Sequence, residues 1–320
     1  MKHGFKALMA ADRSLPAKRT ARLAEGSVEY LTAGDGQPAI ILLDGFGMPL
    51  TGWALVFPEL AKTSTVFTCD LVGAGVGGGP AAEGPQAGRG CGTASIDQLR
   101  GALAAAGVQP PYVLVGHALG ALYANLYARL FPRELAGLVL LEPAHPNDDV
   151  LERHVRFFPR AVTRVLMART LAAQQRLITE TAREIERSGP FPDLPLTVIS
   201  GGRAPSRLTT STKQVAIHAT RQQQLAALSA TAKHIVAPNS EHWPQITDPA
   251  IVVQAVREIV ASTSGPWVGD TERPHRPGPA AWSNPGPTAG GMAGIVSLKP
   301  QSAGALRSPL LQQQPGSVPR

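Results

Sequence analysis

Cysteine is scarce in this chain, which has two cysteines, Cys69 and Cys91, among 320 residues. Two cysteines cannot build the disulfide framework of a small secreted domain, so a reducing, cytoplasmic compartment is expected. The cysteines, histidines and acidic residues also lack the spacing that a metal site requires. We therefore expect neither a bound metal nor a cofactor.

Long apolar runs are absent as well. No stretch approaches the roughly 18 apolar residues that a membrane-spanning helix needs, although 43% of the chain is hydrophobic. The first residues contain no sustained apolar core and no small-residue cleavage site, which argues against a secretory signal. A weak basic, transit-like leader is the alternative for this segment.

Acidic residues are outnumbered by basic ones, which gives a formal net charge of +7. The excess lies at the two ends of the chain. Residues 1–22 hold six basic residues against Asp12, and residues 265–320 hold five against Asp270 and Glu272. The segment between them is close to neutral, so the charge does not point to a nucleic-acid partner.

The ends also differ from the middle in composition. Residues 265–320 are rich in Pro, Gly, Ser and Gln and hold few aliphatic side chains. Such a segment cannot bury enough apolar surface to offset the entropy of ordering, so it is predicted to be a disordered tail. Residues 1–23 are predicted to be a flexible basic leader. A single domain is expected over residues 24–264, which is long enough to bury a substantial core.

Short apolar runs alternate with amphipathic stretches in this domain. The alternation predicts a largely parallel sheet that is covered by helices on both faces. Strands are expected over residues 27–31, 39–43, 65–69, 112–115, 138–141, 196–199 and 234–236. Helices are expected over residues 53–61, 95–106, 119–130 and 249–261. Residues 146–192 form an insertion with helical stretches at 151–158, 162–171 and 174–187.

The most informative motif is the pentapeptide Gly116-His117-Ala118-Leu119-Gly120, which follows the apolar run at residues 112–115. It has the form of the strand, sharp turn and helix that present the nucleophile in G-x-S-x-G hydrolases, but with alanine in place of serine. Gly116 and Gly120 are needed where the helix packs closely beneath the strand. A methyl group can neither lose a proton nor attack a carbonyl. An ordinary tight turn is the alternative interpretation.

A carboxylate and a histidine follow this motif. Glu142 ends the buried strand at 137–141, and His242 lies a few residues after the strand at 234–236. Position 118, the acid and the histidine occur in the chain order of the α/β-hydrolase triad. With these motifs the chain resembles the α/β-hydrolase fold superfamily over about residues 24–262. The matching segments are residues 43–47 with Trp53, 70–75, 116–120, 138–145 and 241–244 with Asp248-Pro249.

Two positions depart from the family's pattern. Asp44 precedes Gly45 where a His-Gly pair is usual, and Glu241 precedes His242 where glycine is usual. The resemblance implies an α/β-hydrolase fold in which the insertion at 146–192 is a small helical cap over the pocket. A helical pair on the surface is the alternative for that insertion.

The resemblance also implies the role of the acid. In this superfamily the carboxylate follows the strand at 138–141 or the strand at 196–199, and the later strand runs into residues 201–204 without an acid. This leaves Glu142, with Asp148 and Asp149 as alternatives. Glu142 would accept a hydrogen bond from one ring nitrogen of His242 and fix its tautomer. A helix-capping or ion-paired surface residue is the other reading of Glu142.

The resemblance further implies an oxyanion hole made by the backbone N–H groups of Phe46 and Leu119. Neither donor depends on a side chain, so the hole can persist without the serine. His117 is expected to pack beneath the turn. The remaining internal histidines are read as surface or core residues; these are His145, His218 and His234.

Three functions follow from a hydrolase framework without its serine. The first is a carboxylic-ester or related acyl-bond hydrolase in which Ala118, natural or engineered, replaces the nucleophile. The second is a non-catalytic pseudoenzyme that binds a small ligand. The third is an enzyme without a nucleophile that uses Glu142 and His242 as a general-base dyad. Each implies a small, partly apolar substrate or ligand, and the oligomeric state is left open.

Overall fold

The computed structural model describes residues 8, 11–24, 26–71, 91–148, 161–203 and 212–263, without side chains for Cys91 and residues 161–170. Contacts divide the chain into two units, residues 1–282 and 283–320, and every described residue belongs to the first unit. The predicted tail, residues 1–7, 9 and 10 of the leader, Asp149 and the helical stretch at 151–158 lie outside the described residues.

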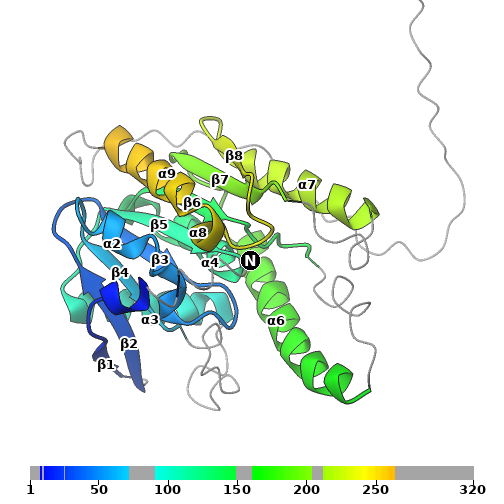
Figure 1. Cartoon of the computed structure of the whole chain (residues 1–320), viewed down its shortest axis with the longest axis horizontal. Coiled ribbons are helices and arrows are strands. Elements are labelled where there is room, and N and C mark those ends of the chain that lie inside the picture. Colours follow the sequence, from blue (N-terminus) through cyan, green and yellow to red (C-terminus); the bar gives the residue numbers. More distant parts are fainter. Residues whose placement is uncertain are drawn as a thin grey trace, which may run out of the picture. The chain divides into compact units, whose positions relative to one another are not determined.

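A mostly parallel sheet forms the centre of the described residues, in the order β1-β2-β4-β3-β5-β6-β7-β8 (Figure 1). The pairs β1–β2 and β2–β4 are antiparallel, and every other neighbouring pair is parallel. The strands are β1 (Arg19–Leu23), β2 (Gly26–Ala33), β3 (Ala39–Leu43), β4 (Val66–Cys69), β5 (Tyr112–His117), β6 (Leu135–Leu141), β7 (Leu196–Gly201) and β8 (Lys233–Ala237).

Helices lie on both faces of the sheet, as the sequence predicted. They are α2 (Phe57–Leu60), α3 (Cys91–Ala106), α4 (Leu119–Leu130), α6 (Ala161–Arg187), α7 (Thr212–Ala226), α8 (Pro244–Thr247) and α9 (Pro249–Ser262). Short 3-10 helices occupy η1 (Asp12–Ser14), η2 (Leu50–Trp53) and η3 (Pro132–Glu134). The predicted helix at 53–61 is wrong in its extent: η2 and α2 are separate elements, and α2 begins at Phe57 with Pro58 in its first turn.

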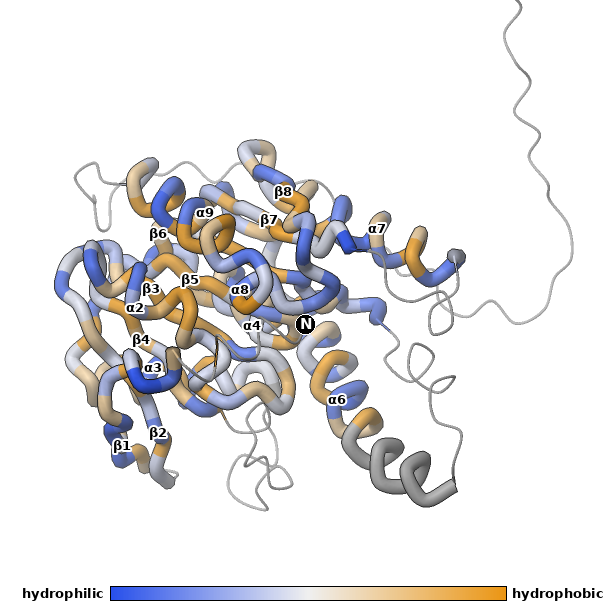
Figure 2. Tube along the Cα trace, viewed as in Figure 1, coloured by the Kyte–Doolittle hydropathy of each residue, from blue (hydrophilic) through white to orange (hydrophobic). Residues whose placement is uncertain are grey.

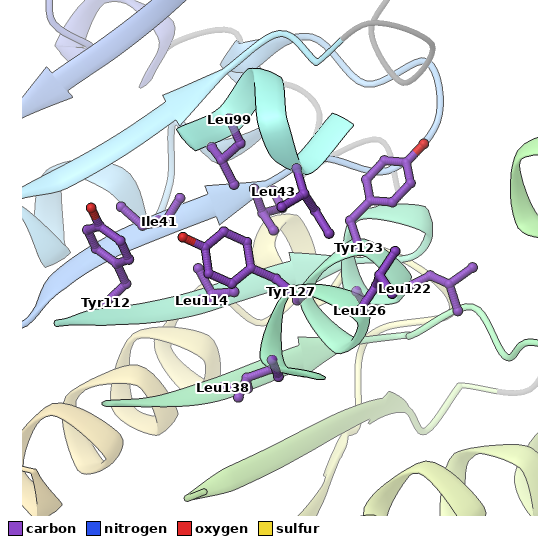
Figure 3. Close-up of a cluster of buried hydrophobic side chains, with 14 of the residues drawn as sticks. Ile41, Leu43, Leu99, Tyr112, Leu114, Leu122, Tyr123, Leu126, Tyr127 and Leu138 are labelled. Atoms are coloured by element: carbon purple, nitrogen blue, oxygen red, sulfur yellow. The ribbon is translucent and has the colours of Figure 1, made fainter. Parts of the chain in front are cut away.

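Side chains alternate between the two faces of the central strands. In β3, Ile41 and Leu43 face one core with residues of α3 and α4, whereas Ile40 and Leu42 face the other with α2 and α9. Figure 3 shows part of the first core, which includes Leu99 of α3 and Leu122 of α4 together with Ile41 and Leu43 of β3. β3, β5 and β6 are buried along their whole length, which explains why they read as continuous apolar runs (Figure 2).

Two elements differ from the sequence prediction. β1 falls within the segment expected to be a flexible leader, yet it pairs along β2 from Arg19 opposite Tyr30 to Leu23 opposite Gly26. Only Ala21 of β1 is buried, so the strand carries little apolar signal. In the insertion, the two helical stretches predicted at 162–171 and 174–187 form the single helix α6.

No helix among the described residues is long and apolar enough to cross a membrane.

Candidate active site

The turn between β5 and α4 has the strained backbone of a nucleophile elbow. Ala118 adopts φ 48° and ψ −110°, a region that residues other than glycine rarely occupy. Backbone hydrogen bonds hold it there. Its N–H donates to Leu141 O at 3.0 Å, and its carbonyl accepts from the N–H groups of Ala121 at 3.2 Å and Ala144 at 3.0 Å.

Two glycines allow the close packing around this turn. A Cβ at Gly116 would lie 2.5 Å from Ala121 Cα in α4, and a Cβ at Gly120 would collide with Leu43 O and lie 2.6 Å from Asp44 O. Backbone atoms cannot move away at either position, so a side chain is excluded. This steric demand is the one inferred from the sequence pattern.

The loop after β3 lies directly against the elbow. A Cβ at Gly45 would lie 3.2 Å from Ala118 Cβ, so residue 118 faces this loop. Phe46 follows and packs against the core cluster that contains Leu119. Leu119 is the first residue of α4, where the N–H has no acceptor within the helix and the helix dipole favours negative charge. The two predicted oxyanion donors are the backbone N–H groups of Phe46 and Leu119. One therefore lies in the loop after β3 and the other at the start of α4, where this loop and the elbow lie against each other.

Glu142 lies directly after β6, with a φ of 42° and a side chain that is 3% exposed. Its Oε1 accepts a hydrogen bond from Gly201 N at 2.5 Å. Its Oε2 lies 3.6 Å from His242 Nδ1, so the two residues are close together but too far apart for the direct hydrogen bond that the sequence predicted. Burial alone would raise the pKa of Glu142, but the His218 and His242 imidazoles hold it well below its usual value.

His242 lies on the loop between β8 and α8, with a side chain that is 40% exposed. Its ring centroid is 5.0 Å from that of His117 and 5.4 Å from that of Trp243. The Nε2–H of His117 donates to the His242 carbonyl oxygen at 2.8 Å. The residue beside the elbow thus also fixes the backbone of the candidate histidine.

His117 is buried beneath the turn, as expected from the sequence. Burial first, and then the nearby His242 imidazole, lower the pKa of His117 to about 3. Its ring is consequently neutral at physiological pH, and its Nδ1 has no hydrogen-bond partner among the described residues. A neutral ring adds no second positive charge beside His242.

A sequence model of the alpha/beta hydrolase fold family matches residues 38–221, which is more than half of the chain. The chain belongs to the α/β hydrolase fold family. An uncharacterized protein of Bacillus subtilis (strain 168), YqjL, is 24% identical over 227 residues, covering 71% of this chain and 85% of that protein. The pimeloyl-[acyl-carrier protein] methyl ester esterase of Sodalis glossinidius is 28% identical over 195 residues, covering 56% and 70%.

Solved structures share the fold of this chain. A putative lipase from Acinetobacter baumannii AYE has a TM-score of 0.56 at 16% identity and covers 81% of this chain and 96% of its own. A serine-to-alanine mutant of a meta-cleavage product hydrolase from Pseudomonas fluorescens IP01, complexed with acetates, has a TM-score of 0.56 at 19% identity and covers 78% and 99%. At these identities the similarity concerns the fold alone.

The alternative acid has other partners in the structure. Asp148 is buried, where its carboxylate binds Arg221 at 2.7 Å and accepts from the His145 N–H at 2.9 Å. Burial lowers the pKa of His145 to about 4. The exposed edge strand β8 carries His234, whose Nε2 lies 2.8 Å from Ser200 Oγ. No group of His, Cys, Asp and Glu that could hold a metal occurs in the described part of the chain.

No sequence signal predicts His218 as a site residue. The sequence indicates a surface or core residue, but His218 lies on α7 with Nε2 3.1 Å from Glu142 Oε2. α7 itself was not predicted, because only Gln222 and Leu225 are buried along it and no apolar stripe marks the helix. No motif in the sequence connects this histidine to the acid.

Proposed function

We propose that this protein has the site of a carboxylic-ester or related acyl-bond hydrolase in which Ala118 occupies the nucleophile position. The observation that carries the proposal is the backbone of Ala118, which keeps the strained elbow conformation at the start of α4. Glu142 and His242 are the proposed acid and base, and the N–H groups of Phe46 and Leu119 are the proposed oxyanion donors. As the sequence stands, the site binds an acyl compound without forming an acyl-enzyme.

The proposed chemistry assigns one step to each group. A serine hydroxyl at position 118 would attack the acyl carbon while His242 Nε2 takes its proton. Glu142 faces Nδ1 of the same ring at 3.6 Å and stabilises the imidazolium that forms. The two backbone donors bind the oxyanion, and losing one such donor costs roughly 3 kcal/mol of transition-state stabilisation. The alanine methyl removes the first step and leaves the other groups in place.

One relative supports the substrate class. The relative from Sodalis glossinidius is named as a methyl ester esterase. The meta-cleavage product hydrolase, which shares the fold, was solved as a serine-to-alanine mutant complexed with acetates. A serine-to-alanine replacement is therefore compatible with this fold.

The test restores the missing group. The Ala118→Ser protein should hydrolyse short p-nitrophenyl esters and should be labelled on residue 118 by an organophosphonate. The chain with alanine should be slower by about six orders of magnitude, as when a triad nucleophile is removed. Ala104→Ser, on the exposed side of α3, is the matched control and should gain nothing. A folded Ala118→Ser protein that is neither active nor labelled contradicts the proposal and favours a ligand-binding pseudoenzyme.

The retained acid–histidine pair favours a second candidate, in which Glu142 and His242 act as a general base without a nucleophile. This function requires that the chain with alanine binds an acidic O–H or C–H compound with uptake of a proton by His242. Calorimetry in two buffers of different ionisation enthalpy measures that uptake. Binding that persists in His242→Ala would exclude the general-base function.

A further inference from the structure

Glu142 has to reach across a strand to serve His242. It ends β6, whereas His242 follows β8, and β7 lies between these two strands. Neighbouring strands are about 4.8 Å apart, so the carboxylate must extend over the end of β7. The position after β7, which is closer to His242, holds Gly202 and Arg203 and no acid. An extended Glu side chain has several rotamers, and they must be restricted if one orientation is to serve the histidine.

Two donors on different elements restrict this carboxylate. The N–H of Gly201, at the end of β7, holds Oε1 at 2.5 Å. The Nε2 of His218, on α7, lies 3.1 Å from Oε2 and 3.5 Å from Oε1. Glu142 Oε2 is thus placed between two imidazoles, with His218 closer than His242 at 3.6 Å.

Two further contacts join α7 to residues 142–148, the segment that begins with Glu142. Arg221 pairs with Asp148 at 2.7 Å, and Gln222 Nε2 donates to Pro143 O at 2.9 Å. Together with His218 these residues have the i, i+3, i+4 spacing of one helix face. All three contact residues 142–148, so His218 is fixed relative to Glu142 by two further bonds.

From these contacts we propose that His218 is a positioning residue, which orients Glu142 so that Oε2 faces His242. The proposal deepens the proposed hydrolase function and rests on its pairing of Glu142 with His242. His218 acts through the carboxylate, because its Nε2–H and the Gly201 N–H fix the carboxylate plane from two sides. Without His218 the carboxylate keeps one anchor and rotates away from His242 for part of the time.

The kinetic test uses two replacements of His218 in the Ala118→Ser protein. A glutamine amide can place an N–H where the imidazole Nε2–H lies, whereas leucine has similar bulk and no donor. His218→Leu should lower kcat about tenfold with KM unchanged, which corresponds to about 1.4 kcal/mol. His218→Gln should retain most of the activity. Gln223→Leu, an exposed position on the same helix, controls for leucine on α7. Equal kcat values in the Leu and Gln variants would overturn the proposal.

The second readout needs no activity and uses the chain with Ala118. Proton NMR at low temperature detects a downfield signal of the His242 Nδ1 proton that depends on the Glu142 carboxylate 3.6 Å away, and Glu142→Gln should abolish that signal. The signal should persist in His218→Gln and disappear in His218→Leu. A signal that persists in His218→Leu overturns the role of His218. A clear His218 effect together with an inert Ala118→Ser protein would instead contradict only the hydrolase function.

Discussion

Replacing His117 by glutamine should make the protein less sensitive to acid. The folded protein keeps His117 neutral, because burial and the nearby His242 lower its pKa to about 3. The unfolded chain has an ordinary histidine with a pKa of about 6.5, so below that pH the unfolded state binds a proton that the folded state does not. From pH 8 to pH 5 this difference costs about 2 kcal/mol of unfolding free energy.

Urea unfolding at pH 8 and pH 5, followed by tryptophan fluorescence, measures the loss. The fully buried Trp53 reports on the core. Glutamine keeps an N–H donor for the His242 carbonyl, which His117 Nε2 holds at 2.8 Å. The loss between the two pH values should be about 2 kcal/mol smaller in His117→Gln. His145 and Asp44 titrate in both proteins, so their contributions cancel. The same loss in both proteins would refute the assignment of His117 as a neutral buried ring.

Three further changes test other parts of the site. Glu142→Asp shortens the side chain by about 1.5 Å, and in the Ala118→Ser protein kcat should fall about 100-fold. Gly201→Ala places a Cβ 2.7 Å from two carbonyl oxygens of the loop before His242, so urea unfolding should show a loss of about 1–3 kcal/mol. Burial first, then Asp70, raises the pKa of Asp44. The folded state holds a proton on Asp44 more tightly than the unfolded chain does, so the free energy of unfolding falls as pH rises. Asp44→Asn should therefore raise the melting temperature more at pH 8 than at pH 5.

The elbow was predictable from sequence because its requirements are local. Nearby backbone atoms leave no room for a side chain at Gly116 or Gly120. At Gly116 these atoms belong to residues a few positions later in the chain, and at Gly120 they belong to Leu43 of β3 and to Asp44. Glu142 and His242 were predictable for a related reason: each follows an apolar strand, and the carboxyl ends of parallel strands meet at one edge of a sheet. Spacing along the chain therefore located them without side-chain detail.

His218 and β1 were not predictable in the same way. α7 is attached to the rest of the domain by polar bonds of Arg221 and Gln222 as well as by apolar packing, and polar attachments leave no periodic pattern. β1 buries one alanine and depends on pairing with β2, so it has no amphipathic signature of its own. In both cases the information lies in contacts between segments.

The strain at Ala118 bears on what a serine would do there. A non-glycine residue at positive φ costs roughly 1–3 kcal/mol and persists only where the surroundings impose it. Here backbone bonds with Leu141, Ala121 and Ala144 impose it, and none of them involves the side chain of residue 118. Serine would therefore adopt the same backbone, with its Cβ facing the loop at Gly45. It follows that a changed elbow backbone could not explain a folded but inert Ala118→Ser protein, and that this result would contradict the hydrolase function.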